Sequence, residues 1–95
     1  MRAATGLRLH VGPNPFNPAT RVAFHLDAPA PVEARVYDVA GREVRTLALG
    51  TLPAGAHRLD WNGRDARGTG VASGVYFLRF QAGGEVRQLK LVMTK

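Results

Sequence analysis

Short runs in which apolar and polar residues alternate, separated by glycine and proline, constrain the fold more than any other feature of this chain. They recur roughly every 10–14 residues, and a period of two is typical of a strand with one buried face. No run keeps the 3.6-residue period of an amphipathic helix, so helix should be minimal. The pattern therefore predicts an all-β fold, with strands expected over residues 7–11, 20–26, 32–38, 43–49, 57–61, 74–80 and 85–94.

The strand spacing is close to that of an immunoglobulin-like β-sandwich of about seven antiparallel strands. The 95 residues are the size of one domain, and no internal repeat or boundary is evident, so residues 1–95 should form a single sandwich. The irregular period of residues 43–49 predicts an edge or bulged strand, with Val44 and Leu47 in the core. The other inward positions given by the alternation are Val22, Phe24, Leu26, Val32, Ala34, Val36, Trp61, Tyr76, Phe80, Leu89, Leu91 and Met93.

Residues 13–18 contain three prolines, which cannot lie in a sheet interior. We expect a rigid loop around one apolar side chain, Phe16, flanked by Asn14 and Asn17. Such a loop could hold a recognition surface in shape without loss of entropy on binding. We favour the simpler interpretation, in which Phe16 plugs the bottom of the sandwich.

The residue types needed for catalysis are scarce. Cysteine is absent, Ser73 is the sole serine, and His10, His25 and His57 fall on different predicted strands. A hydrolase needs a nucleophile beside a base or two facing carboxylates, and neither is evident here. We therefore predict no enzyme activity, no catalytic residues and no cofactor.

The polar stretch after Trp61 is a weak candidate for a calcium site. Asp60, Asn62 and Asp65 place oxygen side chains at short spacing near a glycine, as calcium prefers. The stretch lacks the length and the distal glutamate of an EF-hand loop. We favour Asx turns, in which these side chains bind loop backbone groups.

The formal net charge of +6 comes mostly from arginines spread along the whole chain. Many alternate with apolar residues, which places them on the solvated faces of strands, and this explanation is favoured. Attraction to an anionic surface such as lipopolysaccharide is the main alternative, and nucleic acid is disfavoured. No apolar stretch is long enough for a transmembrane segment, and residues 1–6 do not have the pattern of a signal peptide.

Four motifs occur in order: residues 13–20 (PNPFNPAT), 36–44 (VYDVAGREV), 55–65 (GAHRLDWNGRD) and 72–77 (ASGVYF). Together they resemble the C-terminal sorting domain of type IX secretion cargo. They resemble equally the related immunoglobulin-like domain of flagellar hook-capping proteins. The resemblance covers roughly residues 12–95.

The resemblance to sorting domains implies a module carried by a larger secreted precursor and recognised by the outer-membrane secretion machinery. The cargo would be covalently linked upstream, secreted or held at the cell surface, and attached there to anionic polysaccharide. The alternative is a structural or adhesive module, either hook-cap-like or glycan-binding. The recognition residues implied for the last strand and tail are Lys90, Leu91, Val92, Met93 and Lys95, with Asn14, Phe16 and Asn17 as a second candidate surface.

Overall fold

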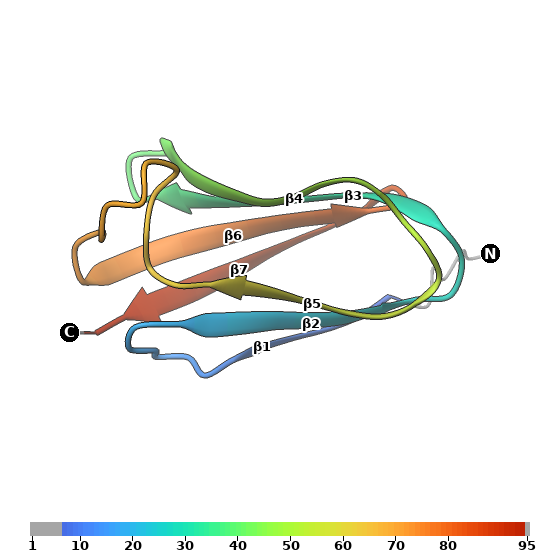
Figure 1. Cartoon of the computed structure of the whole chain (residues 1–95), viewed down its shortest axis with the longest axis horizontal. Helices are drawn as coiled ribbons and strands as arrows, with labels where there is room; N and C mark the ends of the chain where they lie inside the picture. The colour runs from blue at the N-terminus through green and yellow to red at the C-terminus, as the bar shows by residue number, and fades with distance from the viewer. Residues whose placement is uncertain (1–6, 95) are drawn as a thin grey trace.

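The computed structural model describes residues 7–94, which form two antiparallel sheets packed face to face (Figure 1). The smaller sheet has the order β1-β2-β5, and the larger has the order β4-β3-β6-β7. This arrangement confirms the predicted all-β sandwich of seven antiparallel strands. The strands are β1 (Arg8–Gly12), β2 (Thr20–Leu26), β3 (Ala30–Asp38), β4 (Glu43–Leu52), β5 (Gly55–Trp61), β6 (Gly74–Ala82) and β7 (Glu85–Met93).

β4 is an edge strand with an irregular register, as its sequence predicts. Its pairing with β3 shifts between Ala34 and Arg35 and again between Val36 and Tyr37. At these two shifts, Leu47 and Val44 of β4 have no pairing partner on β3, and both side chains pack against the core. Each extra residue rotates the following side chains to the other face, so apolar residues at irregular spacing can all reach the interior.

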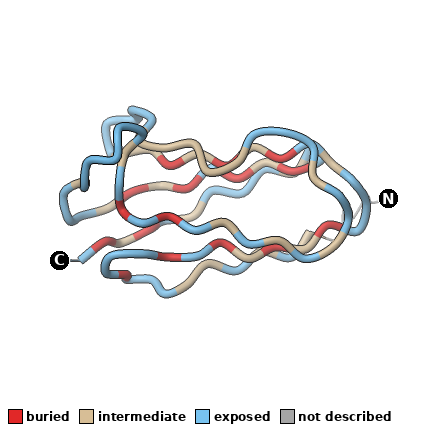
Figure 2. The backbone as a smooth tube through the Cα atoms, in the orientation of Figure 1, coloured by how far each residue is buried: buried red, intermediate tan, exposed pale blue. Residues whose placement is uncertain are grey.

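The core lies between the sheets and follows the predicted alternation (Figure 2). The inward residues of β2 and β3 are at most 5% exposed. Three aromatic side chains meet at one end, where the Trp61 ring lies 5.5 Å from Phe16 and 5.3 Å from Tyr76. Trp61 donates its indole N–H to the Arg64 carbonyl at 2.9 Å, so its polar group is satisfied inside the core.

Within residues 7–94, no helix is long and apolar enough to cross a lipid bilayer.

Candidate functional site

The proline-rich loop lies against the end of β7, so the two predicted recognition segments are in direct contact (Figure 1). Phe16 N–H donates to the Val92 carbonyl at 2.9 Å, and Thr94 N–H donates to the Phe16 carbonyl at 2.9 Å. The Asn14 side chain adds two bonds, from its Nδ2 to the Lys90 carbonyl at 2.8 Å and from Val92 N–H to its Oδ1 at 2.9 Å. We call these four hydrogen bonds the loop contact.

The sequence explains why the chain changes sheets at this point. β1 pairs with β2 up to Gly12, and Pro13 then has no N–H with which to continue the ladder. The buried Thr20 hydroxyl donates to the Pro13 carbonyl at 2.7 Å and holds the turn against the start of β2. The chain then runs parallel to β7, as the parallel bridge between Phe16 and Met93 shows.

Phe16 is only 2% exposed and packs against Trp61. This confirms that it plugs one end of the sandwich, and its ring cannot form part of a surface. Asn14 and Asn17 are both exposed. Asn14 is occupied by the loop contact, whereas Asn17 leaves its carboxamide at the surface.

The structure divides the predicted residues of the last strand into two groups. Leu91 and Met93 are 0% and 3% exposed and belong to the core. Lys90 is exposed and Val92 is half-buried on the opposite face of β7. Lys95 lies outside the described residues. A partner that meets this strand can therefore touch Lys90 and Val92, but not the two inward side chains.

Residues 7–94 cover the outer edge of β7 along only half of its length. In an antiparallel ladder, backbone groups point alternately to the two sides of a strand. The loop contact uses the outward groups of Lys90 and Val92, so those of Val86 and Gln88 point to the same side, because the β6–β7 register has no shift. Among residues 7–94, no strand pairs with β7 on that side at these two positions. We call the outward backbone groups of Val86 and Gln88 the open edge of β7.

The open edge was not predicted from the sequence. The recognition residues expected on β7 were those of its C-terminal half, from Lys90 onward. The exposed positions at Val86 and Gln88 are visible in the alternation, but alternation does not show which strand edge is free. That property depends on the strand order of the folded sheet.

In each of the three calcium candidates, the side-chain Oδ1 atom is engaged by a protein group. Asp60 Oδ1 lies 2.8 Å from Arg21 Nε. Asn62 Oδ1 accepts the backbone N–H of Arg64 at 3.1 Å. Asp65 Oδ1 accepts the backbone N–H groups of Arg67 at 2.9 Å and Thr69 at 3.0 Å. In the described part of the chain, no three His, Cys, Asp or Glu residues form a group that could hold a metal ion.

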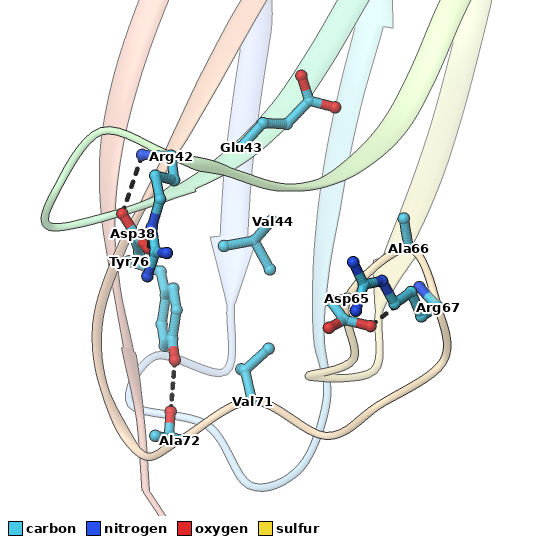
Figure 3. Close-up of a pocket in the computed structure, with 10 residues that line it drawn as sticks. All are labelled: Asp38, Arg42, Glu43, Val44, Asp65, Ala66, Arg67, Val71, Ala72 and Tyr76. Carbon is cyan, nitrogen blue, oxygen red and sulfur yellow. Dashed lines mark hydrogen bonds and ion pairs between the residues drawn. The ribbon is translucent and has the colours of Figure 1, made fainter.

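An open groove of about 550 Å³ lies at one end of the sandwich, between the β3–β4 turn and the loop before β6 (Figure 3). Asp38 Oδ1 accepts the backbone N–H groups of Ala40 and Arg42, both at 2.9 Å. The bond from Arg42 N–H is the main reason that the pKa of the Asp38 carboxyl lies below its ordinary value. The hydrogen bonds of Asp38 therefore order this turn.

Tyr76 forms one wall of the same groove, and its hydroxyl donates to the Ala72 carbonyl at 2.6 Å (Figure 3). Burial raises the pKa of this hydroxyl, and the nearby charge of Asp38 raises it further. Of the residues that line the groove, none is a serine, histidine or cysteine. The groove lining therefore holds no serine or cysteine nucleophile beside a histidine, and its ionisable groups are carboxylates, guanidinium groups and the Tyr76 hydroxyl.

Two solved structures share the fold but show less than 25% sequence identity. PorU from Porphyromonas gingivalis has a TM-score of 0.69 and 16% identity, over 93% of this chain and 9% of that one. PorZ from the same organism has a TM-score of 0.62 and 24% identity, over 92% of this chain and 11% of that one. At this level of identity, these likenesses show the sandwich fold.

FlgD proteins are similar in sequence as well. This chain is 39% identical over 71 residues to the basal-body rod modification protein FlgD of Salmonella typhimurium and to that of Salmonella typhi. The matches cover 74% of this chain, which spans only 31% of the length of these relatives. The crystal structure of FlgD from P. aeruginosa has a TM-score of 0.57 and 27% identity, over 76% of this chain and 58% of that one.

The family model described as the FlgD Ig-like domain matches residues 13–87, which run from the proline-rich loop into β7. This match covers most of the sandwich, and the FlgD relatives agree with it. The chain belongs to the FlgD Ig-like domain family.

Proposed function

We propose that this chain is a non-catalytic sorting module that directs a linked cargo protein across the outer membrane to the cell surface by the type IX secretion pathway. The open edge of β7 is the observation that carries the proposal, because it offers a partner a strand to pair with. The four ordered motifs and the fold likeness to PorZ, described as an essential bacterial surface component of the type-IX secretion system, support this pathway.

The open edge suits recognition by strand addition. An extended segment of a partner can pair with an exposed sheet edge, where backbone hydrogen bonds provide affinity and neighbouring side chains provide specificity. Val86 and Gln88 each contribute one N–H and one C=O on this side. The Val86 side chain is 47% exposed beside them and gives an apolar contact.

Two cations next to the open edge favour an acidic partner. Arg79 lies directly across from Gln88, and Lys90 is two residues further along β7. Both side chains are exposed, and neither forms an ion pair among residues 7–94. Unpaired charges at the rim of an interface mainly increase the rate of association with a partner of opposite sign.

The proposal can be tested with two substitutions at one position. The chain would be fused behind a reporter that carries a signal peptide, in a host with a type IX pathway. Gln88→Ala keeps the outward N–H, whereas Gln88→Pro removes it at an edge position that tolerates proline. We expect the wild type and Gln88→Ala fusions at the cell surface, and the Gln88→Pro fusion in the periplasm.

Thermal unfolding of the purified chains is the control, because the proline must leave the sandwich folded. Periplasmic retention of the wild-type fusion would refute sorting. Equal export of Gln88→Pro and Gln88→Ala would refute the open edge as the recognition surface.

The sequence identity to FlgD favours a second candidate function, as the immunoglobulin-like part of a basal-body rod modification protein. A chimera of Salmonella FlgD, with this chain in place of the matching segment, tests it through swimming motility in soft agar. Motility of the chimera without export of the reporter would replace the sorting proposal. Export without motility would leave sorting as the function.

A further inference from the structure

The outer face of the smaller sheet carries a recess surrounded by basic side chains. Val22, Phe24 and Leu26 point into the core, so the residues between them on β2 face outward. His25 lies across from Arg8 on β1 and Ala56 on β5, and Ala23 lies across from His10 and Arg58. We call these six residues the basic recess: Arg8, His10, Ala23, His25, Ala56 and Arg58.

The shape of the recess follows from the sizes of its side chains. Ala23 and Ala56 are short and lie on adjacent strands, so they form a low floor. The longer side chains of Arg8, His10 and Arg58 stand around it and enclose an open volume of about 480 Å³. The recess is shallow and spans all three strands, which suits an extended ligand that lies across the sheet.

Arg8 and Arg58 stand on opposite sides of β2, and neither forms an ion pair among residues 7–94. A guanidinium presents several N–H donors in a planar array that matches carboxylate, phosphate and sulfate groups. Two such groups around one recess, without a carboxylate on either, give an anionic ligand two places to bind.

The other charged groups on this face do not neutralise the positive charges of Arg8 and Arg58. Arg21 and Asp60 pair with each other at 2.8 Å, beside the recess. Asp27 Oδ1 lies 3.4 Å from His25 Nε2, and in the described chain it is the one carboxylate that pairs with a recess residue. His10 faces the recess from β1 and forms no ion pair in the same described part.

The surface chemistry of the face indicates which polyanion it suits. No phenylalanine, tyrosine or tryptophan occupies an outward position of β1, β2 or β5, so nucleobases find no platform on which to stack. The exposed large apolar side chains, Val39, Leu49 and Val86, all lie on or beside the larger sheet. A protein interface would need apolar anchors at its centre, and this face lacks them in the described residues.

We propose that the basic recess binds an acidic polysaccharide, whose sulfate, phosphate or carboxylate groups pair with Arg8 and Arg58 while the sugar ring lies over Ala23 and Ala56. The recess lies on the smaller sheet, and the open edge of β7 lies on the larger one. The proposal is therefore independent of the sorting function, and either can fail without the other.

Binding of the whole chain to dextran sulfate, with uncharged dextran as the blank, tests the site at pH 7. The variant Arg8→Gln/Arg58→Gln removes both guanidinium groups. The matched control Arg64→Gln/Arg67→Gln removes the same charge from the exposed loop after β5, away from both the recess and the open edge. We expect the recess variant to bind about tenfold more weakly than the wild type, and the control to change Kd by less than about twofold.

Equal weakening of both variants would refute a site, because it would mean that only the net charge matters. Unchanged binding by the recess variant would refute it as well. A single-stranded oligodeoxythymidine that bound the recess as tightly as dextran sulfate would assign the surface to nucleic acid instead.

Discussion

At the scale of single residues, Asn14 takes the place of a strand residue at the edge of β7. Its carboxamide donates to the Lys90 carbonyl and accepts the Val92 N–H, which are the two kinds of bond that a peptide group would make. Asn17 stands in the same Asn-Pro context three residues later, but no hydrogen bond of its side chain is seen in the described structure. The two asparagines are therefore equivalent in sequence and different in structure.

This difference predicts unequal effects of two alanine substitutions. Asn14→Ala removes two hydrogen bonds at the surface and should lower the free energy of unfolding by about 1–2 kcal/mol. Asn17→Ala should change it by less than about 0.5 kcal/mol. Urea unfolding of both variants checks this, and equal losses would contradict the assigned role of Asn14.

The Asp38 carboxyl should make the stability of the domain sensitive to acid. Its pKa is lower in the folded chain than in the unfolded chain, so the unfolded state takes up the proton first as the pH falls. The stabilisation is complete above the ordinary pKa of aspartate, near pH 4, and is lost as the pH falls through the lower folded value.

Asp38→Asn keeps a side-chain oxygen for the turn but removes the titration. The difference in unfolding free energy between the wild type and Asp38→Asn should therefore shrink between pH 6 and pH 2. Urea unfolding at a series of pH values measures this difference. The same difference at both ends of the range would contradict the role of Asp38.

At the scale of elements, Gly63 is where the loop after β5 meets the end of β7. Its φ is +74°, and a Cβ there would lie 2.5 Å from Met93 Cε and 2.9 Å from the Pro18 carbonyl oxygen. Three separate segments of the chain converge on this residue, and only glycine lets them approach so closely.

Gly68 is a matched control, because its φ is +85° and a Cβ there would meet nothing within 4 Å. Gly68→Ala should cost about 1–2 kcal/mol from backbone strain alone. Gly63→Ala should cost about 1–3 kcal/mol more, because Met93 or the loop must also move. Thermal or urea unfolding compares the two variants, and equal costs would contradict the close packing at Gly63.

Most of the strand pattern could be predicted from the sequence, because alternation records which side chains face the core. The bulges of β4 could be predicted as well, from the irregular spacing of Val44 and Leu47. The contact between Asn14 and β7 could not be predicted, because its partners lie 76 and 78 residues away. The basic recess could not be predicted for the same reason. Arg8 and Arg58 come to the same face of the sheet only through the register of three strands.

At the scale of the whole molecule, the sandwich is held together by pairs of strands distant in sequence. β2 pairs with β5 and β3 with β6, so long loops must close before either sheet is stable. Folds dominated by such pairings fold on the order of milliseconds to seconds.

The single tryptophan gives a direct measure of this rate. Trp61 is 1% exposed in the core, so its emission should change strongly on folding. Stopped-flow dilution from urea should show relaxation on the order of milliseconds or slower. Complete folding within microseconds would contradict a rate set by these long-range pairings.

The parallel course of residues 14–16 and β7 has a mechanical consequence. The chain enters β1 at one end of the sandwich and leaves β7 at the other, along the longest dimension of 42 Å (Figure 1). Tension on the two ends would pull these parallel segments along each other, so the four bonds of the loop contact would bear the load together in shear. A domain tethered to a neighbour on each side would thus resist stretching at Asn14 and Phe16 as well as along the β1–β2 ladder, which lies on the same path of force.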